Sequence, residues 1–141
     1  MTPETLSADG WVRVAGSGFT QTLGPLWVRG QTGERTLGFL TSAEHCNNDP
    51  ATVHGGALMT FADLALGFRA AELLRGKACV TAQLQLQFVA RARIGEFVTC
   101  EAELVRCTTS LAFVRGLLRA GEQTVASADG IWKILESKSR Q

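Results

Sequence analysis

Residues 55 to 74 constrain the fold most, because they have the composition of a helix that lacks a polar face. From Gly55 to Phe68 almost every residue is small or apolar, and charged residues become frequent only from Arg69 onward. A helix that is apolar on nearly every side is normally buried. In a chain of 141 residues a sheet is the element that can surround such a helix. We therefore predict a helix from Gly55 to about Leu74, buried all round by a sheet.

The segments after this helix alternate between apolar and polar residues, which is typical of half-buried strands. We predict four of them: Val80 to Phe88, Val98 to Val105, Leu111 to Leu118 and Thr124 to Leu135. The connections around Arg93–Glu96, Cys107–Ser110 and Ala120–Glu122 are short enough for hairpins. Hairpins join antiparallel neighbours, so the four strands are expected to form a meander.

The residues before the helix predict two further strands. Residues 4 to 18 are interpreted as a lead-in helix or loop, residues 19 to 29 as a first strand broken near Gly24–Pro25, and residues 36 to 41 as a second. Residues 44 to 53 are rich in turn-forming residues and indicate a loop. The expected fold is α+β: one long buried helix wrapped by a curved antiparallel sheet of five to six strands, which is the hotdog architecture. We expect a single domain over residues 1–141, with residues 1–18 as its lead-in.

The charge balance excludes a protein that binds nucleic acid by bulk electrostatics. The chain has 14 basic and 13 acidic residues and a net charge of +1, whereas such domains carry a clear basic excess. Its beginning lacks the basic start and apolar stretch of a signal peptide, and no apolar run approaches the roughly 20 residues of a membrane helix. We expect a cytoplasmic protein with neither nucleic-acid nor membrane partners.

The four cysteines do not predict a metal site. None forms a C-x-x-C pair, and His45 and His54 complete no familiar zinc spacing. Cys100 and Cys107 fall in predicted strands, where a free thiol acts as a small apolar side chain. We expect buried, reduced thiols and no bound metal.

Asp63 is the residue that points to chemistry. It is the only ionisable residue between His54 and Arg69. An ionised carboxylate in apolar surroundings costs several kcal/mol unless it is paired, and aspartate is a poor residue for a helix interior. Either a neighbouring hydroxyl or water satisfies it structurally, or it is used as an acid. We favour a catalytic role for Asp63.

Gly55 and Gly56 open the same helix, where backbone N–H groups lack partners and the helix dipole is positive. Glycine also lets a substrate approach the backbone closely. A carbonyl oxygen that gains negative charge during acyl transfer would find donors there. A plain tight turn into the helix is the simpler interpretation of a Gly-Gly pair considered alone.

The spacing of these groups indicates two subunits. Gly55 and Asp63 lie eight residues apart, about 12 Å along a helix axis, which is farther than one aspartate side chain reaches. If both act on one carbonyl, they come from different subunits. An antiparallel pair of helices across a two-fold axis would create two equal sites, so we expect that activity requires a homodimer.

The stretch from Asn48 to Asp63, with its amide residue, its His-Gly-Gly and its acid eight positions after the first glycine, resembles the signature of the PaaI-type hotdog acyl-CoA thioesterases. The similarity continues over about 120 positions. Residues 24–29 resemble the family's first strand, and residues 80–81 and 91–96 resemble its third strand and the turn after it.

The resemblance implies roles for single residues in thioester hydrolysis. The Gly55 amide would polarise the thioester carbonyl, and Asp63 would attack it or activate a water. Asn48 stands where members position the substrate or water, and His54 would shape the loop near the carbonyl. Thr81 stands where some members hold the nucleophilic water. Strand alternation, however, places Thr81 on the face away from its own helix, so it would serve a neighbouring subunit or pair across strands.

The substrate side of the site is also given by the resemblance. Gly56, Arg91 and Arg93 are the expected substrate-binding residues, since guanidinium groups suit the phosphates of coenzyme A. A solvated turn is the alternative for the two arginines. No cofactor is expected, because coenzyme A enters as part of the substrate. Gly67 stands where some aryl-CoA members carry threonine, which would leave room for a bulkier acyl group. The assembly is expected to be a homodimer that pairs into a homotetramer.

Two other functions stay open. Asn48-Asp49-Pro50 followed by His54 loosely resembles a segment of hotdog enoyl-CoA hydratases, although its first two residues are in the reverse order. A non-catalytic acyl-CoA-binding protein on the same fold is the second alternative. The acid on the helix favours the thioesterase over both.

Overall fold

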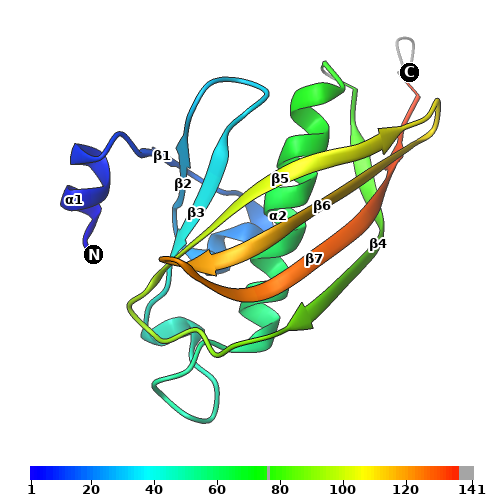
Figure 1. Ribbon diagram of the computed structural model, residues 1–141. Coiled ribbons are helices and arrows are strands. Elements are labelled where there is room, and N and C mark those ends of the chain that lie inside the picture. Colours follow the sequence, from blue (N-terminus) through cyan, green and yellow to red (C-terminus); the bar gives the residue numbers. More distant parts are fainter. Residues whose placement is uncertain (76, 137–141) are drawn as a thin grey trace.

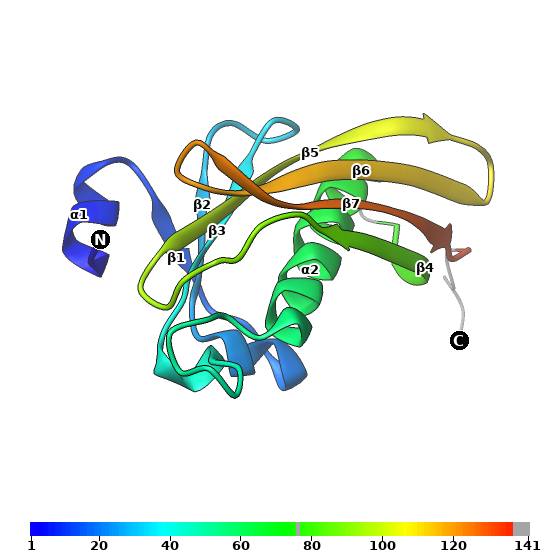
Figure 2. The same cartoon turned by 60° about the horizontal axis from the view of Figure 1, so that its bottom comes forward.

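A long helix, α2 (Gly55–Leu73), packs against one face of a seven-stranded antiparallel sheet (Figure 1). The computed structural model describes residues 1–75 and 77–136, so the predicted domain extends slightly beyond them. The other elements are α1 (Pro3–Ala8), β1 (Val12–Val14), η1 (Gly18–Leu23), β2 (Leu26–Arg29), β3 (Thr36–Leu40), η2 (Ala43–His45), β4 (Cys79–Phe88), β5 (Phe97–Cys107), β6 (Leu111–Ala120) and β7 (Gln123–Ile134). The sheet curves over the helix, as Figure 2 shows. The predicted helix and the α+β class are confirmed.

The order of strands differs from the predicted meander. The sheet runs β1-β2-β3-β5-β6-β7-β4, so β4 pairs with β7 at one edge and β5 joins β3. The expected β4–β5 hairpin is wrong, because residues 89–96 bond to the loop before α2 instead of turning back. The Val53 amide donates to the Ala92 carbonyl, and the Ile94 amide donates to the Ala51 carbonyl. Because of these bonds, the chain after β4 runs along the loop before α2 and reaches β5, which lies between β3 and β6.

The N-terminal part is also more structured than the sequence predicted. The proposed first strand over residues 19–29 is a 3₁₀ helix over Gly18–Leu23 followed by β2, because Gly24 takes a φ of 75° that ends the helix. The lead-in holds both α1 and the short strand β1, which pairs with β2. The described residues therefore contain seven strands, where five to six were predicted.

The main core lies between α2 and the inner face of the sheet. Alternation along β5 and β6 holds as predicted: Val98, Cys100, Val114 and Leu118 are all buried there. A smaller cluster lies apart from this core, where Leu6 and Trp11 of the N-terminal segment pack with Trp27 and Phe97. Among the described residues no helix is long and apolar enough to cross a membrane.

The helix is not buried on all sides, contrary to the prediction. Gly56 and Met59 are exposed, while Thr60, Asp63 and Gly67 are half-buried. These five residues share one side of α2, because their spacing follows the helical period. We call them the open stripe. One chain thus leaves the stripe that carries the acid in contact with solvent, while Leu58, Phe61 and Leu66 of the same helix are buried.

Candidate active site

Asp63 is held by a threonine from the edge strand. The Thr81 hydroxyl donates a hydrogen bond of 2.6 Å to Asp63 Oδ1. The prediction that Thr81 faces away from its own helix is wrong. A β-bulge breaks the register, so that Thr81 pairs with Trp132 while Gln83 pairs with Ile131. The extra residue, Ala82, reverses the alternation of side chains, and Thr81 therefore turns toward α2.

The start of α2 presents one free amide. His54 is the N-cap, and its Nδ1 accepts a hydrogen bond of 2.8 Å from the Gly56 amide. The hydrogen bonds among the described residues include none from the Gly55 amide, as expected for the first residue of a helix. The dipole adds positive potential at this point. Of the two glycines, Gly55 is thus the one with a donor available to a ligand.

A small pocket of about 360 Å³ adjoins this free amide. Gly55 and Leu58 of α2 line it, together with Phe88 at the end of β4 and Arg91 just after it. The ring of Phe88 lies near Gly55, at 3.5 Å from the position that a Cβ atom would take there. The pocket therefore combines a backbone donor, an apolar side and a guanidinium group.

The loop before α2 is organised by Asp49, a residue that sequence reasoning considered only for the hydratase. Its carboxylate accepts from the Ala51 amide at 3.1 Å and from the Thr52 hydroxyl at 2.7 Å, and it lies 3.3 Å from Arg91 Nη1. The Thr52 hydrogen bond, followed by that of the Ala51 amide, lowers the pKa of this carboxyl. Asp49 therefore stays ionised and orients Arg91.

Two other predicted site residues, Asn48 and Arg93, make hydrogen bonds only through their backbone groups in the part of the chain that the structure describes. Asn48 is exposed, and among the described residues only its backbone amide makes a hydrogen bond, to Asn47 Oδ1. The Arg93 side chain is exposed too, while its backbone amide donates to Glu96 Oε1 at 2.7 Å. His54, Gly55 and Gly56 thus form the start of α2, Arg91 lines the pocket beside it, and Asn48 lies on the loop that precedes it. Asp63 and Thr81 form a separate group two turns farther along.

Gly67 does not leave the space that was expected. A Cβ atom there would lie 3.0 Å from Nε1 of Trp132, whose indole already occupies this position. Trp132 is only 2% exposed, and nothing in its sequence context marked it as a neighbour of the acid. The prediction of extra room for an acyl group is therefore wrong, because β7 fills that room.

Cys79 is a second neighbour of the acid that the sequence did not reveal. Partial burial raises the pKa of its thiol, and the negative charge of Asp63 raises it further. All four cysteines are free, as predicted, but only Cys100 is buried and Cys107 is exposed. Among the described residues no group of three or more acidic, histidine or cysteine side chains is placed to hold a metal ion.

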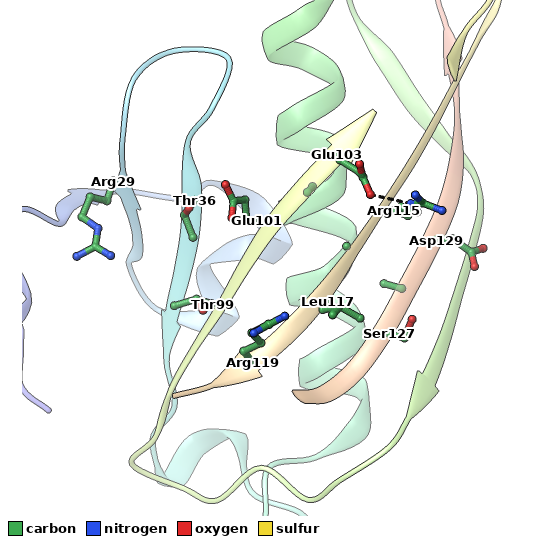
Figure 3. Close-up of a pocket in the computed structure, with 13 residues that line it drawn as sticks. Arg29, Thr36, Thr99, Glu101, Glu103, Arg115, Leu117, Arg119, Ser127 and Asp129 are labelled. Carbon is green, nitrogen blue, oxygen red and sulfur yellow. Dashed lines mark hydrogen bonds and ion pairs between the residues drawn. The ribbon is translucent and has the colours of Figure 1, made fainter. Parts of the chain in front are cut away.

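A larger hollow lies elsewhere, on the outer face of the sheet (Figure 3). It measures about 1020 Å³ and is lined by side chains of mixed charge from β2 to β7. Its lining includes Arg29, Arg115 and Arg119 together with Glu101, Glu103 and Asp129, of which Arg115 and Glu103 form an ion pair of 2.8 Å. Neither Gly55 nor Asp63 borders it, so its size does not make it the active site.

The fold and the two groups along α2 define the class of this chain: an α+β protein of the hotdog fold. A family model described as the thioesterase superfamily matches residues 51–127, which include α2 and most of the sheet after it. A Pseudomonas aeruginosa protein named "Putative esterase PA0474" is 34% identical over 115 residues, 79% of this chain and 84% of that protein. The chain belongs to the thioesterase superfamily.

Solved structures agree with this assignment. A mutant of PaaI, a phenylacetic acid degradation protein of Thermus thermophilus, has a TM-score of 0.73 at 25% identity, covering 83% of this chain and 98% of that one. BH2602 of Bacillus halodurans, solved with CoA, has a TM-score of 0.71 at 24% identity, covering 79% and 74%. The resemblance to PaaI-type proteins is confirmed, and the family and the esterase-named relative support a hydrolase.

Proposed function

We propose that this protein hydrolyses acyl-CoA thioesters at a site shared by two copies of the chain. The observation that carries the proposal is the hydrogen bond of 2.6 Å from Thr81 to Asp63 Oδ1. Among the described residues, no group donates a hydrogen bond to Oδ2 of this carboxylate. A carboxylate that is held in place on an apolar helix and keeps one oxygen free suits a general base or a nucleophile.

The chemistry needs two groups on one carbonyl. Either Asp63 takes a proton from a water that attacks the thioester carbon, or its Oδ2 attacks that carbon and water then cleaves the anhydride. In both routes the carbonyl oxygen becomes negative, and the free Gly55 amide is the donor suited to stabilise it. The carbon–sulfur bond then breaks, the CoA sulfur takes up a proton, and the free acid leaves.

One copy of α2 does not supply both groups. Gly55 and Asp63 lie eight residues apart within this single helix, or about 12 Å along its axis. In an antiparallel pair of helices, Asp63 of one copy lies beside Gly55 of the other. The proposed site therefore requires a homodimer with two-fold symmetry.

The surface around the site suits such a pairing. The open stripe of α2 borders β4, which is the last strand of the sheet and has an unpaired edge. Exposed apolar residues lie at both ends of this strand: Val80 is 49% exposed near its start, and Phe88 (53%) and Val89 (57%) lie at and just after its end. A long exposed edge strand with apolar side chains is a site of strand pairing. Pairing of two β4 edges would cover both stripes.

The pocket at the start of α2 is the proposed binding site for the phosphates of coenzyme A. Arg91 lines this pocket, and Arg93 lies two residues farther along the chain. The guanidinium groups of both residues are suited to phosphate oxygens. Asn48 and His54 lie on the loop that enters the helix, where they would position the thioester. The CoA in the structure of BH2602 supports this ligand class. The reaction uses no cofactor.

A thiol-release assay over short, long and aryl acyl-CoAs tests the proposal, with wild-type protein and Asp63→Asn. The amide is neither base nor nucleophile, so we expect kcat to fall by roughly 10²- to 10⁴-fold. Asp129→Asn, an exposed carboxylate on the outer face, is the matched control and should keep full activity. Near-normal turnover by Asp63→Asn would refute the assigned role.

Two further outcomes would identify the alternatives. Addition of water to crotonyl-CoA without thiol release would indicate a hydratase. Binding of acyl-CoAs without release of thiol from any of them would indicate a non-catalytic protein. The same panel of compounds separates all three functions.

A further inference from the structure

The indole of Trp132 occupies a slot made by two glycines. Its Nε1 lies 3.0 Å from the position of a Cβ atom at Gly67 on α2. Its six-membered ring, through Cζ3 and Cη2, lies 2.6 and 2.8 Å from the position of a Cβ atom at Gly130 on β7. A Cβ atom at Gly130 would collide with the ring, and one at Gly67 would press closely against it. The chain thus holds a large aromatic group between helix and sheet at a defined point.

That point is beside the acid. Gly67 follows Asp63 by four residues, one turn and about 6 Å along the same side of the helix. Thr81, which bonds to Asp63, is the Cα partner of Trp132 across the β4–β7 pair. The carboxylate, its threonine and the buried indole therefore lie near one another between α2 and the sheet.

We infer that Trp132 closes the end of the acyl pocket and limits the length of the acyl group that the site accepts; this rests on the proposed function. A thioester carbonyl at Asp63 has a polar arm, through sulfur to CoA, and an acyl arm. The polar arm belongs with the Arg91 pocket at the partner's helix start. The acyl arm then extends along the apolar surface past Asp63, where Gly67 carries no side chain and the indole blocks further passage.

The test compares kcat/KM for a series of straight-chain acyl-CoAs, from acetyl to palmitoyl, between wild type and Trp132→Leu. Removing the ring lengthens the pocket, so we expect the ratio of long-chain to short-chain kcat/KM to rise by about tenfold or more, since each accommodated methylene discriminates by that order. Trp27→Leu is the matched control. Trp27 is equally buried, at 2% exposed, but lies in the smaller cluster away from Asp63. It should leave the chain-length profile unchanged.

Two more variants keep the inference testable if Trp132→Leu does not fold. Trp132→Phe keeps an aromatic ring but shortens it and should shift the profile in the same direction. Gly67→Ala presses on the indole and should shift the optimum toward shorter chains. Folded variants of Trp132 with the wild-type profile would overturn the inference.

A binding measurement separates this inference from the proposed function. Dissociation constants for non-hydrolysable acyl-CoA thioethers give the same chain-length profile without turnover. Binding without thiol release from any substrate would refute the hydrolase, while a profile that shifts in Trp132→Leu would still support the pocket. A profile that does not shift would refute the pocket even if the wild type hydrolyses thioesters.

Discussion

At the scale of single residues, the site depends on one inserted residue in an edge strand. Ala82 shifts the register of β4, and this shift turns Thr81 toward Asp63. The period of two that predicted the strand also predicted the wrong face for Thr81, because alternation contains no information about where a bulge falls. Asp63, by contrast, could be singled out as a candidate from the sequence, since a lone carboxylate among apolar residues of a helix is costly where it is buried without a partner.

The hydrogen bond from Thr81 fixes the carboxylate. Hydrogen bonds to charged groups contribute about 1.5–3 kcal/mol, so Thr81→Val should lower kcat by roughly 10- to 100-fold. Thr81→Ser keeps a hydroxyl and should restore most of the rate. Steady-state kinetics on both variants checks this, with thermal unfolding to show that they are folded. A loss of rate in the serine variant but not in the valine variant would mean that the methyl group matters and the hydroxyl does not.

The thiols report on the surroundings of Asp63. Burial raises the pKa of Cys100 to about 12, and the thiolate is the reactive form, so Cys100 should resist alkylation until the protein unfolds. Exposed Cys107 should react first. Burial and then the charge of Asp63 raise the pKa of Cys79, so Asp63→Asn lowers that pKa and increases the thiolate fraction at a given pH.

We therefore expect faster alkylation of Cys79 in Asp63→Asn than in the wild type, and no change at Cys107. Mass spectrometry of iodoacetamide-treated protein at several time points gives both rates in one experiment. An unchanged rate at Cys79 would show that Asp63 is not charged beside it.

At the scale of elements, the sequence predicted the helix and the strands better than it predicted which strands pair with one another. The helix was expected to end near Leu74 and ends at Leu73, because its apolar run dominates the local signal. The pairing of β4 was wrong because it depends on residues 89–96, whose backbone bonds to the 51–53 segment. Tertiary contacts decide which strand β4 pairs with, and the local sequence contains no pattern that indicates it.

A buried ion-pair cluster connects α2 to the turn between β2 and β3. Glu72 Oε2 accepts from the Gly33 amide at 2.8 Å and lies 3.6 Å from Arg35 Nε, and its Oε1 lies 3.4 Å from Arg69 Nη1. Arg69 is 6% exposed and donates to the Ala102 carbonyl on β5 at 2.8 Å. The end of the helix, the β2–β3 turn and the centre of the sheet are thereby held together.

Glu72→Ala leaves the buried guanidinium of Arg69 without its carboxylate. We expect a loss of about 3–5 kcal/mol in the free energy of unfolding, measured by urea denaturation. The double change Arg69→Met with Glu72→Leu should lose less than the sum of the single changes, since neither charge remains buried alone. Glu103→Ala, at an exposed pair with Arg115, is the control and should lose about 0–1 kcal/mol. Equal losses at the two sites would contradict the role of burial.

At the scale of the whole molecule, one chain leaves its most apolar helix incompletely covered. The open stripe of α2 and the unpaired edge of β4 lie side by side, and both end near the free amide of Gly55. The predicted burial of the helix on all sides fails for the single chain and would be met in a dimer. In the proposed dimer, the spacing of eight residues between Gly55 and Asp63 would place the donor of one copy beside the acid of the other across a two-fold axis.

Mixed dimers test this arrangement directly. Gly55→Pro removes the amide hydrogen with little change in the backbone: proline suits the first position of a helix, and His54 before it already has the extended conformation, with φ −64° and ψ 136°, that proline requires. Gly55→Ala is the control, since it keeps the amide and its Cβ makes an ordinary contact of 3.5 Å with Phe88. Both the Gly55→Pro and the Asp63→Asn homodimers should be nearly inactive.

The two variants are co-expressed with different tags, and the mixed dimer is isolated on both. If each site takes its amide from one copy and its acid from the other, the mixed dimer has one intact site, made of Gly55 from the Asp63→Asn copy and Asp63 from the Gly55→Pro copy. Its other site lacks both groups. We expect about half of the wild-type activity per dimer, since one of two equivalent sites is restored. If both groups act within one copy, neither copy is complete and the mixed dimer stays as inactive as its parents.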